Sequence, residues 1–368
     1  MASNAPRSRE QVLVLYTELA PYVLACLNAL VERANVDIHL VRWPVNAEAP
    51  FELAFDPHIT VYDRRSLTTE ALLALADRIA PRLVLASGWV DKSYLKVCQR
   101  MRSNGATTVM TFDTAWRGGL KQWLSSGMGR FWIPATYSHA WATGERQSRY
   151  AEMLGFAPDR IRSGFYAADT GPFVQAYASA SAARKVRYPH RFICVARYIE
   201  TKGQQQLCDA FAALCDEGRA GDWELHLMGV GDRFDAVRNS RSGKHPRIVH
   251  RGFVQAKDMP EMLAASGASV VPSTYEPWGV VVQEHACMGL PLLLSDAVGA
   301  AERFLRKGEN GTSHKAGDVP DISVSLATIV ASSDVELVAM GARSAALGAA
   351  WTPQHWAEVA EDLLQQRP

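Results

Sequence analysis

The sequence contains few cysteines, no excess of charge of one sign and no long apolar run. Six Cys stand among 368 residues, none in a C-x-x-C pair, which argues against a disulfide scaffold and predicts reduced, mostly buried thiols. The balance of 39 Lys+Arg against 38 Asp+Glu argues against a protein that coats nucleic acid. Since no uncharged apolar run of about 18 residues and no signal peptide is visible, we expect a cytoplasmic protein without a membrane-spanning helix.

The remaining composition is that of a globular protein, with 48% hydrophobic and 21% charged residues. At about 150 residues per domain, the length favours two domains. Short apolar runs alternate with stretches of helical spacing, which predicts parallel sheets covered by helices on both faces. The first half has expected strands at 11–16, 36–43, 59–62, 82–86 and 107–111, and helices at 22–33, 69–79 and 92–102. The second half has expected strands at 191–196, 223–228, 248–250, 269–272 and 292–295, and helices at 204–215, 259–265 and 280–288.

The alternation breaks between Ala167 and His190, where small residues, two prolines and a basic cluster replace the apolar runs. We therefore expect a first domain at residues 1–175 and a second at 176–351, with residues 352–368 forming a helix that returns to the first domain. The fold class is α/β, with two Rossmann-like, doubly wound domains. Because ligands of such domains bind outside the carboxyl ends of the strands, a cleft between the domains is the expected site.

Two cations follow the first expected strand of the second domain. Arg197 and Lys202 stand in the loop after residues 191–196, just before a helix. A guanidinium grips phosphate with two parallel hydrogen bonds, an ammonium adds a point charge, and helix amides add donors. The pattern indicates an anion site; the alternative is a solvated basic loop.

A G-x-G motif follows the next expected strand, at Gly229 and Gly231. Two glycines let a backbone approach a ligand closely. The third glycine of the dinucleotide fingerprint is missing, because Phe stands at position 234. A nicotinamide dehydrogenase is therefore a weak alternative.

The third motif runs from Glu276 to Glu284, after the strand at residues 269–272. A turn with Pro277 and Gly279 leads into a helix, whose first amides, at Gly279 and Val280, are expected to face a ligand. The two carboxylates lie too far apart on one segment to flank a single bond, which disfavours a glycoside hydrolase. The spacing suits two separate hydroxyl contacts; the alternative is one capping Glu and one surface Glu.

In this order, the three motifs resemble the retaining GT-B glycosyltransferases of family GT4, or glycosyltransferase group 1. The resemblance covers residues 197–311 and includes Glu276-x7-Glu284. It continues through Gly289-Leu290-Pro291, Gly299-Ala300-Ala301-Glu302 and Gly308-x-Asn310-Gly311. The first domain matches only in outline, at residues 150–156 and 164–169.

The resemblance implies a role for each matching residue. Arg197 and Lys202 would hold the donor diphosphate and stabilise the leaving nucleoside diphosphate. Glu276 would bind hydroxyls of the donor sugar, and Glu284 the ribose hydroxyls. The remaining donor-binding positions are Gly229, Gly231, Val254 beside the base, and Pro277, Trp278, Gly279 and Val280. No metal and no cofactor is implied, since the two cations take the metal's place; the co-substrate is a nucleotide sugar, with UDP or GDP the expected nucleotide.

The first domain departs from the family pattern in two places. The loop after the first strand, at residues 17–21, lacks the usual glycine pair but contains Glu18. The later strand that usually ends in His is followed here by Asp113, a candidate contact for the acceptor hydroxyl or the donor sugar; the alternative is a helix N-cap. Trp89 and Trp116 follow strand ends and are candidates for the acceptor side, because aromatic rings stack on sugar faces.

The activity expected is transfer of a sugar, with retention, to an acceptor hydroxyl in bacterial-type glycan or glycoconjugate synthesis. The acceptor is left open among a glycan, a lipid-linked sugar and a small molecule. The segment at residues 116–132 mixes Trp, Leu and Phe with Arg and Lys, so contact with a membrane surface stays open beside a loop packed on its own domain. The rival functions are a nucleotide-sugar 2-epimerase and a non-catalytic nucleotide-sugar-binding module.

Overall fold

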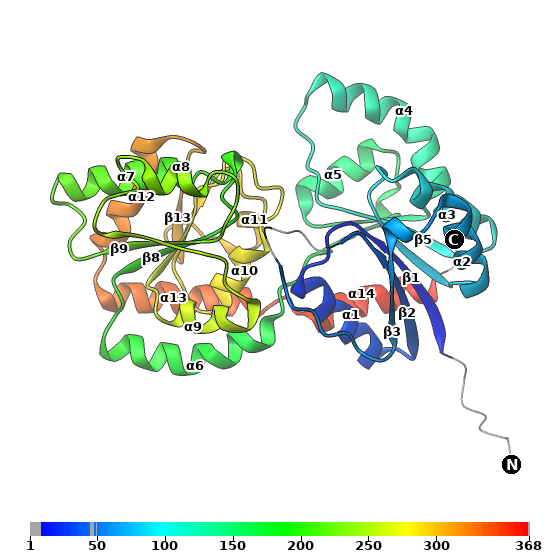
Figure 1. Ribbon diagram of the computed structural model, residues 1–368, viewed down its shortest axis with the longest axis horizontal. Helices are drawn as coiled ribbons and strands as arrows, with labels where there is room; N and C mark the ends of the chain where they lie inside the picture. Colours follow the sequence, from blue (N-terminus) through cyan, green and yellow to red (C-terminus); the bar gives the residue numbers. More distant parts are fainter. Residues whose placement is uncertain (1–8, 45–47, 49, 367–368) are drawn as a thin grey trace, which may run out of the picture. The chain divides into compact units, whose positions relative to one another are not determined.

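The computed structural model describes residues 9–44, 48 and 50–366. The chain divides into two compact units (Figure 1). Within the described part, the first unit contains residues 9–44, 53–166 and 353–366, and the second contains residues 48, 50–52 and 167–352.

The first unit is built on a seven-stranded parallel sheet in the order β3-β2-β1-β4-β5-β6-β7. The order reverses beside β1, which creates a topological switch point between β1 and β4. The strands are β1 Glu10–Tyr16, β2 Val36–Arg42, β3 Ile59–Asp63, β4 Leu83–Ser87, β5 Thr107–Phe112, β6 His139–Ala142 and β7 Ile161–Ser163.

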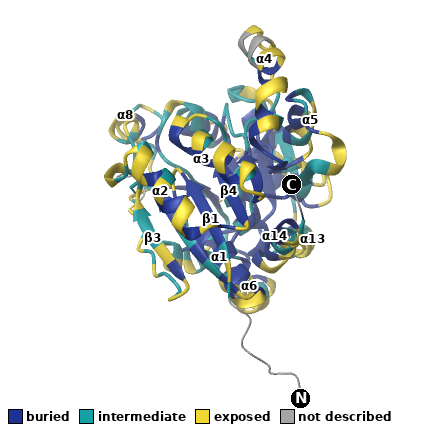
Figure 2. Cartoon of the chain, turned by 90° about the vertical axis from the view of Figure 1, so that its right-hand side faces the viewer, coloured by how far each residue is buried: buried dark blue, intermediate teal, exposed yellow. Residues whose placement is uncertain are grey.

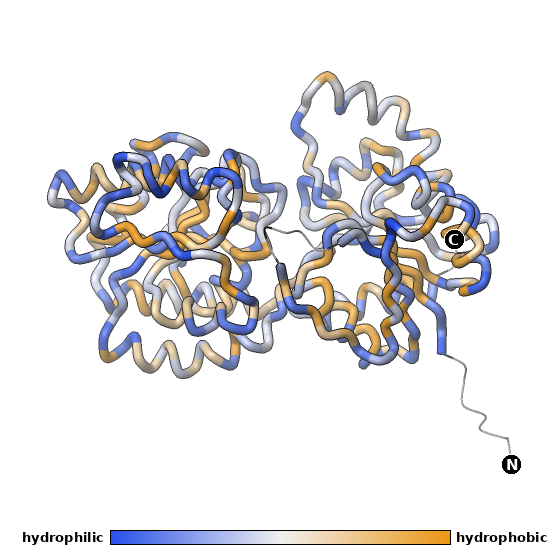
Figure 3. Tube along the Cα trace, in the orientation of Figure 1, coloured by the Kyte–Doolittle hydropathy of each residue, from blue (hydrophilic) through white to orange (hydrophobic). Residues whose placement is uncertain are grey.

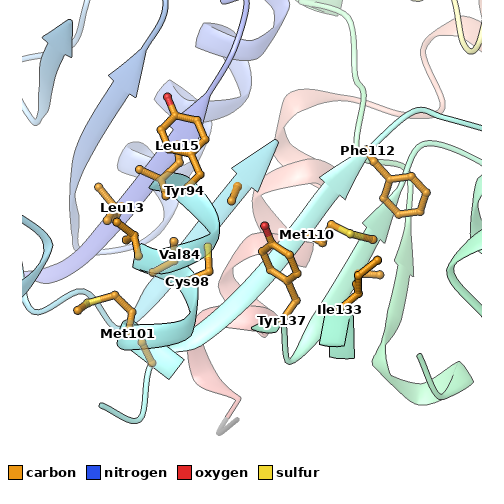
Figure 4. Packing of buried hydrophobic residues seen from close by; sticks show 14 of the residues in the cluster. Leu13, Leu15, Val84, Tyr94, Cys98, Met101, Met110, Phe112, Ile133 and Tyr137 are labelled. Carbon is orange, nitrogen blue, oxygen red and sulfur yellow. The ribbon is translucent and has the colours of Figure 1, made fainter. Parts of the chain in front are cut away.

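Helices and their caps complete the first unit. The Asp91 carboxylate accepts from the amides of Ser93 and Tyr94, which fixes the start of α3. Residues of β1, β4 and β5 pack on the apolar face of α3 (Figure 4), and the burial colours in Figure 2 show the sheet as the core of this unit. The helices are α1 Pro21–Arg33, α2 Thr69–Ile79, α3 Lys92–Ser103, α4 Leu120–Thr136, α5 Glu145–Met153 and α14 Pro353–Gln365, with 3-10 turns η1 Arg64–Ser66 and η2 Pro158–Arg160.

The C-terminal helix α14 packs against α1 in the first unit. Its Trp356 is buried, stacks on Trp141 at 4.7 Å between ring centroids, and donates an indole hydrogen bond of 2.7 Å to the Phe165 carbonyl. These contacts attach α14 to the unit that contains β1.

The second unit contains a six-stranded parallel sheet in the order β10-β9-β8-β11-β12-β13, with a switch point between β8 and β11. The strands are β8 Arg191–Val195, β9 Glu224–Met228, β10 Ile248–Arg251, β11 Ala268–Val271, β12 Leu292–Ser295 and β13 Gly311–His314. The helices are α6 Thr170–Val186, α7 Gln204–Asp216, α8 Phe234–Asn239, α9 Met259–Ala264, α10 Val280–Cys287, α11 Ala301–Phe304, α12 Val319–Val330 and α13 Asp334–Gly348, with η3 Glu200–Lys202 and η4 Ala256–Asp258.

The predicted fold class, two Rossmann-like α/β domains, is confirmed. The division of the chain falls between Tyr166 and Ala167. The boundary expected at residue 175 lies inside the continuous helix α6, so the two units divide before this helix. The stretch before His190 has no strand because its alanines and basic residues favour helix. Five of the six cysteines are buried.

Candidate functional site

The two predicted cations lie at the carboxyl end of β8. Arg197 stands in the loop after the strand, and Lys202 ends the η3 turn just before α7. Gly203 joins the η3 turn to α7 at φ +73°, and a Cβ on it would lie 2.4 Å from the Pro272 carbonyl oxygen. Only glycine allows the start of α7 to rest this closely against the end of β11. The cations are thereby held beside the switch point of the sheet.

Lys202 and Glu276 form a largely buried ion pair. The Lys202 Nζ lies 2.5 Å from the Glu276 Oε2, with 18% and 12% of the two side chains exposed. The Ser273 hydroxyl donates to the same oxygen at 3.3 Å, and the Thr274 amide donates to the Thr201 carbonyl at 2.8 Å. The structure therefore brings together two predicted site residues that are far apart in sequence.

The G-x-G glycines hold the loop that carries Arg197. Gly229 and Gly231 have φ of +133° and +153°, and a Cβ on them would lie 2.0 Å from the Ala196 oxygen and 2.5 Å from the Tyr198 oxygen. Their closest neighbours are thus backbone atoms on either side of Arg197. The sequence predicted that these glycines let the backbone approach a ligand closely. The structure shows that both positions need glycine even when no ligand is considered, because a Cβ would collide with the neighbouring backbone.

The turn after β11 leads into α10 through Gly279, which has φ +95° and is the N-cap residue. The Gly299 amide donates to the Glu276 carbonyl at 3.0 Å, and the Ala300 amide to the Trp278 carbonyl at 2.9 Å, so the turn is anchored. The expectation for Trp278 needs correction at its side chain. Its ring is only 2% exposed and lies under the Arg303 guanidinium, so the ring packs inside the unit, whereas Pro277, Gly279 and Val280 are partly exposed.

Glu284 is the fifth residue of α10 and has an unusual protonation equilibrium. Burial raises the pKa of Glu284 to about 7, and the charge of Asp169 adds to the shift. Burial also raises the pKa of Asp169. Beside them, the Gln283 side-chain oxygen accepts from the Ala168 amide at 2.8 Å, which attaches the segment just before α6 to α10. A raised pKa favours the protonated carboxyl, which can donate a hydrogen bond as well as accept one.

A short segment between β2 and β3 also reaches the Arg197 side of the second unit. The Glu48 Oε2 lies 3.4 Å from the Arg197 Nη1, with 35% and 38% of the side chains exposed. The Phe51 ring meets Phe253 edge-on at 5.2 Å, and Gln255 donates to the Pro50 carbonyl at 3.1 Å. These contacts flank Val254, the predicted wall for the base. Sequence reasoning missed Glu48 and Phe51, and no motif marks them.

In the first unit, Asp113 directly follows β5. The Tyr166 hydroxyl donates to its Oδ2 at 3.3 Å, and the Gln147 side chain donates to its carbonyl at 2.9 Å. Burial raises the pKa of Tyr16, Tyr22 and Tyr166, and the charge of Asp113 adds to each shift.

The next helix begins only at Leu120, with Gly119 as N-cap, so Asp113 is not a helix cap. The tyrosines were not predicted, since no spacing connects them along the chain.

The other first-domain candidates lie near the ends of β1, β4 and β5. Trp89 lies 6.4 Å from Phe112, and Trp116 lies 5.6 Å from Tyr150, between ring centroids. Both are partly buried, while Glu18 after β1 is exposed. Within the described part of the chain, no three His, Cys, Asp or Glu side chains gather as metal ligands. In the same part, no single helix is long and apolar enough to cross a membrane; one pair bent by 109°, Val319–Val330 with Asp334–Gln365, passes on length and composition.

Comparison with solved structures places the whole chain in one fold class. Sucrose-phosphate synthase from Thermosynechococcus elongatus aligns over 97% of this chain and 99% of its own, with TM-score 0.72 and 16% identity. Anabaena HepE in complex with UDP-glucose aligns over 97% and 100%, with TM-score 0.72 and 16% identity. The two parallel-sheet units therefore form a GT-B fold.

Sequence comparison finds relatives for a large part of the second unit. Residues 189–332 match the model of the family described as glycosyl transferases group 1. Glycogen synthase from Mycobacterium tuberculosis H37Rv is 32% identical over 154 residues, which cover 40% of this chain and 36% of the relative. The core-lipopolysaccharide glycosyltransferase LpsE of Rhizobium meliloti is 31% identical over 137 residues, covering 37% and 38%. The matched region thus spans little more than a third of each of these relatives.

Proposed function

We propose that the protein is a retaining glycosyltransferase that moves a sugar from a nucleotide sugar to an acceptor hydroxyl. The observation that carries the proposal is the Lys202–Glu276 pair, whose lysine follows the same strand as Arg197, in a region that matches the glycosyl transferases group 1 family. Two cations and a carboxylate at one set of strand ends match the chemistry of a sugar diphosphate, which presents anionic oxygens next to hydroxyls.

The reaction follows from these groups. The bond between the anomeric carbon and the diphosphate oxygen breaks, and a bond from the acceptor oxygen to that carbon forms on the same face. The acceptor proton passes to an oxygen of the leaving phosphate. Arg197 and Lys202 stabilise the negative charge that grows on the diphosphate, while Glu276 orients the sugar hydroxyls. Because the two cations neutralise the diphosphate, we propose that no metal ion is needed.

The donor we propose is a UDP-sugar, with a GDP-sugar as the other candidate. Structures of the similar protein HepE contain UDP and UDP-glucose, which supports a nucleotide-sugar donor. The acceptor we propose belongs to glycan or glycoconjugate synthesis in the cytoplasm, and LpsE, a relative named for lipopolysaccharide core biosynthesis, supports that class.

The test is incubation of purified protein with UDP-, GDP-, ADP- and dTDP-sugars, with release of free nucleotide as the readout. We expect turnover with one nucleotide, and Lys202→Ala lowers kcat by about 10²–10³-fold through loss of transition-state charge stabilisation. Lys185→Ala, at an exposed position of α6, is the matched control and keeps the wild-type rate.

Other outcomes separate the rival functions. Release of UDP together with an epimerised sugar, without any acceptor, identifies a 2-epimerase. Nucleotide binding, seen as a thermal shift, without turnover identifies a binding module. An unchanged kcat in Lys202→Ala contradicts the phosphate role of this lysine.

A further inference from the structure

Helix α4 of the first unit exposes its apolar side chains. Leu120, Trp123, Met128 and Phe131 are 77%, 60%, 69% and 79% exposed. At about 100° per residue, the four fall within a stripe about 140° wide along the helix. We call these four residues the apolar face of α4. Four large apolar side chains on one exposed face are typical of an interaction surface.

The opposite side of α4 packs against the unit. Ser126, Gly129, Ile133 and Thr136 are buried. The Gln99 side chain of α3 donates to the Thr136 hydroxyl at 3.2 Å, and a Cβ on Gly129 would lie 3.5 Å from Leu154. The small-residue side therefore makes the contacts with α3 and with the end of α5, and Figure 2 shows the outer part of α4 as largely exposed.

The charged residues in the sequence of this segment have one sign. Between Asp113 and Glu145 the sequence contains Arg117, Lys121 and Arg130 and no acidic residue. Arg117 and Arg130 are exposed, and Arg130 lies next to Phe131 of the apolar face. Cations beside exposed Trp, Leu and Phe match a surface with acyl chains below negatively charged head groups.

A second copy of the chain fits this face less well. A two-fold contact through the apolar face would bring the same patch of both copies together, and with it the same cations. Like charges brought together in this way would repel each other. An anionic bilayer satisfies both the apolar stripe and the positive charge.

We propose that the apolar face of α4 docks on the surface of an anionic phospholipid bilayer, with the helix lying in the interface. The unit that carries Asp113, Trp89 and Trp116 then sits at a membrane. This inference rests on the proposed function and narrows it. Of the acceptors left open, a lipid-linked sugar is the one that a membrane-bound enzyme would meet.

Vesicle co-sedimentation tests the proposal with the full chain. We expect binding to vesicles of phosphatidylcholine with about 30% phosphatidylglycerol, and weaker binding to phosphatidylcholine alone. The variant Leu120→Ser/Met128→Ser/Phe131→Ser should bind the anionic vesicles at least about tenfold more weakly. Its matched control is Val324→Ser/Val335→Ser, which removes valines that are 59% and 80% exposed on the second unit and should bind like wild type.

A second arm examines charge. Arg117→Gln/Arg130→Gln should weaken binding to the anionic vesicles and leave binding to phosphatidylcholine unchanged, and 0.5 M NaCl should release the wild type from anionic vesicles. A far-UV circular dichroism spectrum and a Tm equal to those of wild type show that each variant is folded. Because the vesicles contain no nucleotide sugar, failure of the transfer reaction leaves this result unaffected.

Three outcomes overturn the proposal. One is wild-type protein that stays in the supernatant with anionic vesicles. Another is equal binding by wild type and the triple serine variant. The third is a dimer in sedimentation velocity that the triple variant abolishes, which would assign the apolar face to a second copy.

Discussion

The two units share a parallel sheet with a switch point but differ in what their strand ends carry. In the second unit, Lys202 and Glu276 form a largely buried ion pair, and Arg197 stands in a loop held by close glycine contacts. In the first unit, the strand ends carry Asp113 with tyrosines, and Trp89 and Trp116. Phosphate chemistry is common to every nucleotide sugar and demands cations, whereas aromatic rings and one carboxylate suit varied hydroxyl-bearing acceptors.

Among the substitutions that test this difference between the units, Asp113→Asn is expected to change the activity most. Asp113→Asn removes a charge that can accept a proton or a strong hydrogen bond, so kcat/KM should fall by about 10–100-fold. The affinity for UDP should stay at the wild-type value, because the cations assigned to the diphosphate belong to the second unit. Steady-state kinetics and calorimetric titration with UDP measure the two quantities.

The control for Asp113 is Asp159→Asn, at a carboxylate with 80% of its side chain exposed in the same unit. It should leave both quantities unchanged. If Asp113→Asn weakened UDP binding as strongly as Lys202→Ala, the division between the two units would be wrong.

The hydrophobic periodicity of the sequence was sufficient to predict most of the helices and strands. The helix at Thr69–Ile79 and the strand at Leu292–Ser295 were predicted with the observed bounds, because amphipathic spacing and buried apolar runs are local signals. Helix α4 was harder to predict from the sequence, because its glycines weaken the helical pattern. The structure shows that Gly129 is buried against neighbouring side chains, which is a tertiary reason for that glycine.

The same distinction applies to the candidate site. Lys202 and Glu276 were predictable because their motifs have fixed spacings at strand ends. Glu48 and Phe51 of the second unit, and Tyr166 of the first, were not predictable, because each makes its contact from a loop whose neighbours are decided by tertiary packing. The missed residues therefore come from contacts distant in sequence, which carry no spacing signal.

A smaller effect is expected at Glu48. Its carboxylate pairs with Arg197, a cation proposed to bind the donor phosphate, so the two anions compete. Glu48→Gln should raise the affinity for UDP by about threefold, since an ion pair this exposed is weak. Calorimetric titration at low salt measures the change. Glu52→Gln is the matched control, because Glu52 pairs with the exposed Lys257 and should have no effect. Weaker UDP binding in Glu48→Gln would instead show that Glu48 supports the donor site.

The last prediction concerns the pH dependence of stability at Glu284. Burial raises the pKa of this carboxyl from 4.5 to about 7, so the folded state holds a proton that the unfolded chain has already lost between these values. Because the folded state binds more protons there, ionisation of Glu284 lowers stability as the pH rises from about 4.5 to 7.

Glu284→Gln removes this ionisation, so its Tm should fall less than that of wild type across the same window. The two Tm curves should diverge up to about pH 7 and run parallel above it. Glu358→Gln, an exposed carboxylate on α14, is the control and should follow the wild-type curve. Parallel curves for Glu284→Gln and wild type below pH 7 would mean that Glu284 ionises at an ordinary pKa, and the second unit would then hold a permanently charged carboxylate at the proposed ribose position.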